Sequence, residues 1–243
     1  MRVLAFAVAA LSFAVLRDVI PGNVSVLLLV PLAMAWRWLD RPAGAVGLAV
    51  AMAVRPTLGV MLIWQLLRRR WQGVARTIVA GLALILASLP FVGLDGYLDY
   101  LTVVRNLGGM TGVERNVDLG TTLLDLGASE DAARVALFGG YGAAVAAILL
   151  ALRRDREVGF MVTLSGSLLL APLMWDHYLV ALLLPAAFLA ERGRRVGFVL
   201  PLLTWLPAEC CPCWPLRPRS CHSGCASQTS SPLSLPRERT RPS

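Results

Sequence analysis

A carboxylate and an imidazole stand side by side within an apolar stretch near the end of the chain. This stretch runs from Leu164 to Pro185 and is interrupted once, by Trp175-Asp176-His177-Tyr178. A charged Asp in hydrocarbon costs roughly 2.5 kcal/mol or more, so such residues usually face a cavity or mark a site. A carboxylate can also orient a neighbouring imidazole. The alternative is an ordinary turn between two spans, with its aromatic residues in the membrane interface and the Asp in water.

A second charged residue, Arg55, interrupts the apolar run from Ala43 to Leu67 and is followed by Pro56. Proline breaks or kinks a helix. If the arginines on both sides of this run lie in the cytoplasm, the run must enter and return on the same side. Each arm then has about a dozen residues, or roughly 18 Å of helix, which is too short for a ~30 Å bilayer core. The sequence therefore predicts two half-helices that meet at Arg55-Pro56, with one kinked span and a buried Arg55 as the alternative.

The composition of the chain places these residues in a membrane protein. Of 243 residues, 57% are hydrophobic and 16% are charged, and the mean hydropathy is +0.66. Soluble domains are less apolar and carry about 25% charged residues. The net charge of +8 does not indicate nucleic-acid binding, because the arginines fall between apolar runs and not on one continuous basic face.

The apolar runs predict an all-α, polytopic integral membrane protein with some broken or re-entrant helices. The first run could also be a signal peptide, but no clear cleavage site follows it, so a membrane helix is the interpretation we favour. The runs are Val3–Leu16, Asn23–Leu39, Ala43–Leu67, Val74–Val92, Val135–Leu152, Val158–Met174, Tyr178–Ala190 and Val196–Leu206.

The positive-inside rule makes one topology consistent, that of a multi-pass plasma-membrane domain over residues 1–207. Four arginine groups then face the cytoplasm: Arg37 with Arg41, Arg68–Arg70 with Arg76, Arg153–Arg156, and Arg192–Arg195. The outer face receives the turn from Arg17 to Gly22, an external loop over residues 94–134, and Trp175–Tyr178. A polar stretch as long as this loop is expected to be functional or to contain short interfacial helices.

Residues 208–243 differ completely from the rest of the chain. They are rich in Ser, Pro, Arg and Cys, so we expect a disordered tail, of the kind that a shifted reading frame would produce. All five cysteines lie between Cys210 and Cys225, but their spacing lacks the paired C-x2-C geometry of closed zinc sites. We predict no metal site and no resident cofactor, and we assign the tail no function.

Two groups of residues resemble glycosyltransferase family 87, whose members are membrane mannosyltransferases of the GT-C fold that use polyprenyl-phosphate-mannose. The family's Gly-Gln turn, Ala-Gly segment, Lys-Pro and Arg-Arg-x-Trp are similar to Gly22-Asn23, Ala43-Gly44 with Gly47, Arg55-Pro56 and Arg69-Arg70-Trp71. Its Ser-Pro-x-Ser-Trp-Asp-His-His resembles Ala171–Tyr178. Full members also carry spans and an acidic external loop ahead of the first motif, so we expect this chain to be a truncated member.

The resemblance implies a GT-C-like helical bundle that moves a hexose, mannose in the first instance, from a polyprenyl-phosphate donor to a lipid or glycan acceptor on the outer face. Membrane lipids are the other expected partners, and nucleic acid is not one. Arg55 would hold the donor phosphate through its planar fork, or else have a structural role at the break. The expected catalytic residues are Asp176, His177 and Asp18, the last as a substitute base; the expected donor-binding residues are Arg55, Tyr178, Asn23 and Asn116.

Two other functions remain open at the sequence level. Transporters and flippases of lipid-linked sugars also use discontinuous helices, but they commonly contain internal repeats, and the pattern from Ala43 to Arg70 has no second copy in the chain. The third hypothesis is a non-catalytic membrane subunit.

Overall fold

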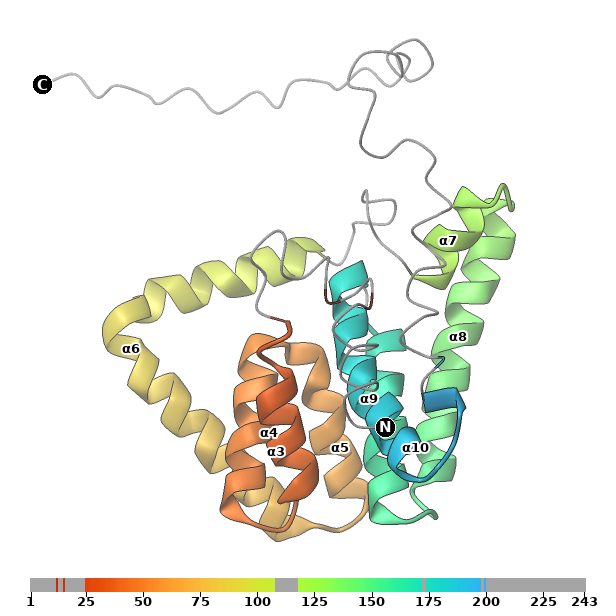
Figure 1. The fold of residues 1–243 in the computed structure, drawn as a ribbon. Helices are drawn as coiled ribbons and strands as arrows, with labels where there is room; N and C mark the ends of the chain where they lie inside the picture. The colour runs from red at the N-terminus through yellow and green to blue at the C-terminus, as the bar shows by residue number, and fades with distance from the viewer. Residues whose placement is uncertain are drawn as a thin grey trace, which may run out of the picture. The chain divides into compact units, whose positions relative to one another are not determined.

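The computed structural model describes residues 12, 15, 25–107, 118–171, 174–197 and 199. These residues form helices and no strand, which confirms the all-α expectation (Figure 1). The chain divides into Met1–Ala208 and Glu209–Ser243, and the second unit, with the predicted tail, lies outside the described residues. The helices are α3 Leu29–Arg37, α4 Pro42–Val54, the 3-10 helix η1 Pro56–Gly59, α5 Val60–Leu67, α6 Trp71–Leu107, α7 Leu119–Asp125, α8 Glu130–Ala151, α9 Arg156–Leu169, the 3-10 helix η2 Asp176–Leu182 and α10 Leu183–Glu191.

The predicted break at Arg55-Pro56 is confirmed, because α4 ends at Val54 and η1 begins at Pro56. The two arms return to the same end of the helices. Asp40, which precedes α4, forms an ion pair with Arg70, which follows α5. A single kinked span would separate these two residues by the length of both arms. The geometry therefore agrees with two half-helices and not with the kinked-span alternative.

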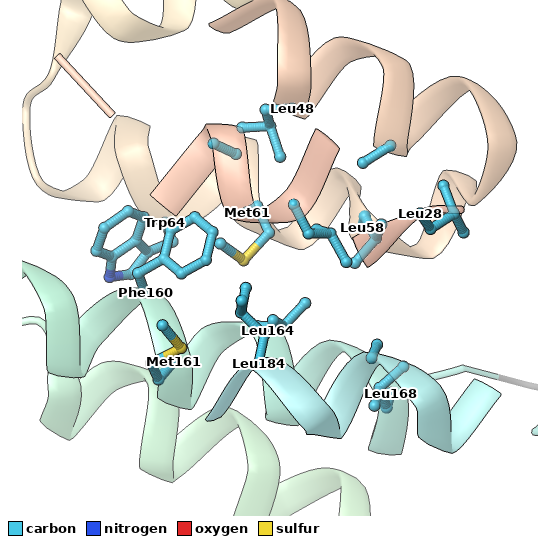
Figure 2. Close-up of a cluster of buried hydrophobic side chains, with 14 of the residues drawn as sticks. Leu28, Leu48, Leu58, Met61, Trp64, Phe160, Met161, Leu164, Leu168 and Leu184 are labelled. Carbon is cyan, nitrogen blue, oxygen red and sulfur yellow. The ribbon is translucent and has the colours of Figure 1, made fainter. Parts of the chain in front are cut away.

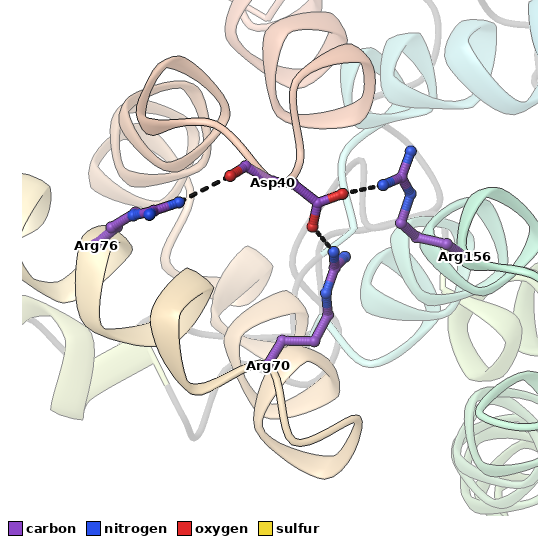
Figure 3. Close-up of polar contacts among 4 residues, drawn as sticks. All are labelled: Asp40, Arg70, Arg76 and Arg156. Carbon is purple, nitrogen blue, oxygen red and sulfur yellow. Dashed lines mark hydrogen bonds and ion pairs between the residues drawn. The ribbon is translucent and has the colours of Figure 1, made fainter.

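One exposed carboxylate at this end, that of Asp40, contacts arginines from separate parts of the chain. Asp40 pairs with Arg70 and Arg156 through its two carboxylate oxygens, and its backbone carbonyl accepts a hydrogen bond of 2.7 Å from Arg76 (Figure 3). Burial, and next the nearby charge of Arg156, lower the pKa of Arg70 from its ordinary value. Arg70, Arg76 and Arg156 belong to two of the arginine groups predicted to share one face. Arg37 and Arg41, of a third group, line a hollow together with Asp40 and Arg156.

The fourth arginine group joins the same end through α9. Arg192, just after α10, donates to Glu157 in the first turn of α9 at 3.1 Å. Arg68 donates to the carbonyl of Arg154 at 2.9 Å. We call the end of the helices that carries these residues and the Asp40 contacts the basic end.

The helices of the two halves of the chain share one core, shown in Figure 2. Trp64 of α5 and Phe160 of α9 are both completely buried, and their rings meet edge to face with centroids 6.2 Å apart. This geometry is the one that aromatic pairs prefer. Other buried members are Leu28, Leu32, Leu48, Leu58, Met61, Leu164, Leu168 and Leu184.

A close approach of backbone explains one glycine of the family-like motif. A Cβ atom at Gly44 would lie 2.1 Å from the carbonyl oxygen of Trp38, which no side chain can tolerate without a shift. Helix α4 packs along α3, and the missing side chain at Gly44 is what allows the connection between them to be so short. The motif thus positions the α4 arm that leads to Arg55.

Among the described residues, two helices are long and apolar enough to cross a membrane, Trp71–Val103 and Glu130–Ala151. The first changes direction at Gly93, whose φ of 70° lies in the region that favours glycine. The second begins at Glu130 and not at Val135, because the Ser129 hydroxyl caps it by accepting from the Ala132 amide. The polar stretch therefore contains helical residues, as its length predicted, and its external position remains a prediction.

Candidate functional site

Arg55 lies at the junction between the two arms, and the local sequence fixes its backbone. The ring of Pro56 disfavours an α-helical conformation in the preceding residue, and Arg55 is extended, with φ −132° and ψ 94°. Its amide still donates to Ala51 at 2.8 Å, and its carbonyl accepts from the Leu58 amide at 3.0 Å. The break therefore leaves the backbone at Arg55 hydrogen-bonded while its side chain turns away from the axis of α4.

The side chain of Arg55 is only 6% exposed, and it links two distant segments. Its Nη2 donates to the hydroxyl of Ser25, just ahead of α3, at 2.6 Å. Its Nη1 makes a longer contact of 3.4 Å to the carbonyl oxygen of Tyr178. Its Cζ lies 3.7 Å from the centroid of the Tyr178 ring, a cation–π contact. A buried guanidinium held between a hydroxyl and a ring face is the central feature of the site.

The residues Trp175–Tyr178 enter this site as the start of a 3-10 helix. Trp175 is extended and precedes η2, which begins at Asp176. The rings of His177 and Tyr178 meet edge to face with centroids 4.8 Å apart, and the rings of Trp175 and His177 are 5.8 Å apart. The segment is a turn, as both sequence interpretations required, but it packs against Arg55 from the far end of the chain.

The structure thus brings together three of the predicted site residues, Arg55, Tyr178 and His177. Ser25 was missed, although a lone hydroxyl at the start of an apolar run was visible in the sequence. The backbone of Asp176 is described but its side chain is not. Three further predicted site residues lie outside the described residues: Asp18, Asn23 and Asn116.

An apolar groove of about 600 Å³ opens beside the break, between α4 and α6. Val54 and Pro56, on either side of Arg55, both line it. Its lining also includes Ser88 and Tyr97, whose hydroxyls contact each other. A groove of this volume falls within the range of about 300–1,000 Å³ that is usual for ligand sites. Within the described ranges, no group of three or more His, Cys, Asp or Glu could hold a metal ion.

The fold and the site define an all-helical, membrane-associated protein with a buried arginine at a broken helix. The model of Glycosyltransferase family 87 matches residues 1–175, and the chain therefore belongs to that family. Membership makes the protein a membrane glycosyltransferase, with a sugar donor and an acceptor as substrates, and it confirms the resemblance found in the sequence. No curated protein and no solved structure matches the chain. The family match ends at Trp175, so His177 and Tyr178 join the site through their contacts.

Proposed function

We propose that the protein transfers a hexose, mannose in the first instance, from a polyprenyl-phosphate donor to a lipid or glycan acceptor on the outer face of the plasma membrane. The observation that carries this proposal is the position of Arg55. Its guanidinium is buried at a helix break, in contact with Ser25 and Tyr178. A buried cation in an otherwise apolar helix pair suits a lipid-borne anion better than a neutral sugar.

The proposed reaction inverts the anomeric carbon. The acceptor hydroxyl oxygen forms a new bond to C1 of the hexose while the bond from C1 to the phosphate oxygen breaks. Polyprenyl phosphate leaves with the electron pair, and Arg55 stabilises the negative charge that develops on it. Arg55 contacts two neutral groups that a phosphate could replace, the Ser25 hydroxyl and the Tyr178 carbonyl. A phosphate oxygen would form a stronger, charge-assisted hydrogen bond in their place.

The proton of the acceptor hydroxyl needs a base, whose help typically contributes about 10²–10⁴-fold to the rate. We assign hydrogen bonding of the phosphate to His177, whose ring abuts the ring that covers Arg55. We assign to Asp176 the role of orienting His177. Asp18 is our candidate for the base. Asn23, Asn116 and Tyr178 complete the proposed donor site.

The groove between α4 and α6 supports a lipid-linked donor. It begins at residues adjacent to Arg55 and is lined by aliphatic side chains of both helices, among them Val50, Leu82 and Ile85. A polyprenyl chain in this groove would place its phosphate near the break without an energetic cost for burying polar atoms. The proposed donor therefore matches both halves of the site, cation and groove.

The orientation follows from the basic end, which the positive-inside rule assigns to the cytoplasm. Arg55 lies at the far end of α4 from Asp40 and would face outward. To test this, the five cysteines between Cys210 and Cys225 are replaced by Ser, and Leu126→Cys or Arg153→Cys is added. We expect an impermeant thiol reagent to label Leu126→Cys on intact cells and Arg153→Cys only after lysis. The reverse pattern would place the site in the cytoplasm.

The activity itself is tested with membranes that contain the protein, supplied with a radiolabelled polyprenyl-phosphate hexose and scored for label in the acceptor fraction. We expect transfer by the parent chain and none by the Arg55→Ala, His177→Ala double variant. Arg134→Gln is the control, because Arg134 is exposed and pairs only loosely with Glu130 at 3.8 Å. Transfer that survives the double substitution would refute the site.

A further inference from the structure

A second and larger cavity, of about 820 Å³, lies along α8, α9 and α10. Helix α9 packs against both α8 and α10, so it forms the floor of the cavity and the other two helices form its walls. The wall from α8 consists of small side chains, Ala143, Ala144 and Ala147. Their small size leaves this space unfilled on the α8 side. We call this space the α8–α10 slot.

The slot is apolar along its length and cationic at one end. Its aliphatic and aromatic lining includes Met161, Leu169 and Phe188, whereas Arg192 and Arg194 line its end. Arg192 stacks on Phe188, with its Cζ 4.2 Å from the ring centroid, and reaches Glu157 at 3.1 Å. Glu157 belongs to the first turn of α9, so this end of the slot is part of the basic end. The slot is therefore apolar along its length and positively charged at one end, which we call its mouth.

We propose that the α8–α10 slot binds an anionic lipid, with a phosphate-bearing headgroup at Arg192 and Arg194 and a hydrocarbon chain along α9. The site differs from the proposed donor site, because Arg55 lies at the opposite end of the bundle and its groove is formed by α4 and α6. It does not depend on sugar transfer.

The chemistry at the mouth selects the anionic class of lipid. Among the described residues, Glu157 is the carboxylate that pairs with Arg192, and Arg194 adds a second positive charge to the lining. The guanidinium groups of Arg70 and Arg156, near Asp40, add positive charge at the same end. Basic pockets between membrane helices on the cytoplasmic side are a recognised setting for anionic headgroups. A neutral headgroup would gain nothing from this charge.

The first test measures charge selectivity by native mass spectrometry of the purified full chain in detergent, titrated with phosphatidylglycerol or phosphatidylcholine. We expect the parent to bind phosphatidylglycerol more tightly than phosphatidylcholine. The double variant Arg192→Gln, Arg194→Gln should bind phosphatidylglycerol more weakly, by about fivefold per removed charge. Arg194→Gln alone should show the single step while the Arg192–Glu157 contact is kept. Arg105→Gln with Arg134→Gln removes the same charge from exposed positions outside the slot and should change nothing.

The second test fills the slot. Ala147→Phe introduces a ring into the lining and should reduce the binding of both lipids at least fivefold, the smallest change that the titration must resolve. Ala146→Phe is the matched control, since Ala146 is the exposed neighbour on α8 that does not line the slot. Equal binding by the two variants would overturn the proposal, as would equal binding of the two lipids by the parent.

Two further outcomes would also overturn it in favour of another occupant. Inorganic phosphate that displaces phosphatidylglycerol at equal concentration would make the mouth a site for free phosphate. Weak binding of both lipids by the parent and by Ala147→Phe alike would leave the slot to an occupant other than these lipids.

Discussion

At one end of the helices Arg55 is buried against a tyrosine ring and a hydroxyl, whereas at the other end Arg70 and Arg156 meet Asp40 at the surface. The side chain of Asp40 is 56% exposed, and Arg55 is 6% exposed. Water screens the charges of the basic end, so each contact there is worth little by itself. The buried arginine has no such screening, so its partners decide its energy. The same residue type thus has a proposed chemical task at one end and an architectural one at the other.

The largest expected effect comes from removing the buried cation. Arg55→Ala should lower sugar transfer by about 10²–10³-fold, the usual loss when one charge-stabilising donor is removed from an active site. Arg55→Lys should fall between the parent and Arg55→Ala, because an ammonium keeps the charge and loses the planar fork. Initial rates at saturating donor measure both. If Arg55→Ala and the exposed Arg134→Gln had equal rates, the contrast between the ends would have no catalytic meaning.

The next effect tests whether the basic end is held by shape as well as by charge. Gly44→Ala should destabilise the protein by about 1–3 kcal/mol, because the new Cβ must push the Trp38 carbonyl aside. Gly142→Ala is the control, since a Cβ there meets nothing within 4 Å, and it should be neutral or stabilising by up to about 1 kcal/mol. Thermal unfolding in detergent distinguishes the two. Equal melting temperatures would show that α3 and α4 adjust freely.

Removing the carboxylate of the basic end should have a smaller effect. Asp40→Asn should cost about 1 kcal/mol or less, because the two ion pairs are partly exposed. The cost should shrink further at high salt, where exposed charges are screened. Melting temperatures of parent and variant, compared at about 0.05 M and 1 M NaCl, measure this. A cost that is large and independent of salt would make the basic end resemble the Arg55 end.

The smallest effect is expected for Tyr178→Phe. The ring that covers Arg55 and the backbone carbonyl that contacts it are both retained, so transfer should stay within about twofold of the parent. Tyr178→Ala removes the ring and should cost on the order of tenfold, as a desolvated cation–π contact of about 1–2 kcal/mol implies. The two rates are compared in the same transfer assay. A tenfold loss in Tyr178→Phe would assign the phenol hydroxyl a chemical role.

Two features of the fold, the helix break and the grouping of the arginines, could be predicted from the sequence. Proline geometry located the break at Arg55, and the preference of arginine for one side of a membrane grouped Arg70, Arg156 and Arg192 at one end. The resemblance placed Arg55 and Tyr178 in one site, but their direct contact and the hydrogen bond to Ser25 could not be predicted, since both depend on how α3 and η2 pack. Two signals were present but unused. Ser129 ahead of Glu130 marks a helix start, and Asp40 is a lone acid among arginines.

The two arginines that pair with Asp40 are synthesised at different times. Arg70 follows it closely along the chain, but Arg156 comes 116 residues later. At a synthesis rate of about 5–20 residues per second, roughly 6–23 s separate the emergence of Asp40 from that of Arg156. The Asp40 carboxylate must therefore stay accessible until the start of α9 is made. A surface ion pair suits that delay, because an exposed carboxylate can stay unpaired in water at little cost until Arg156 emerges.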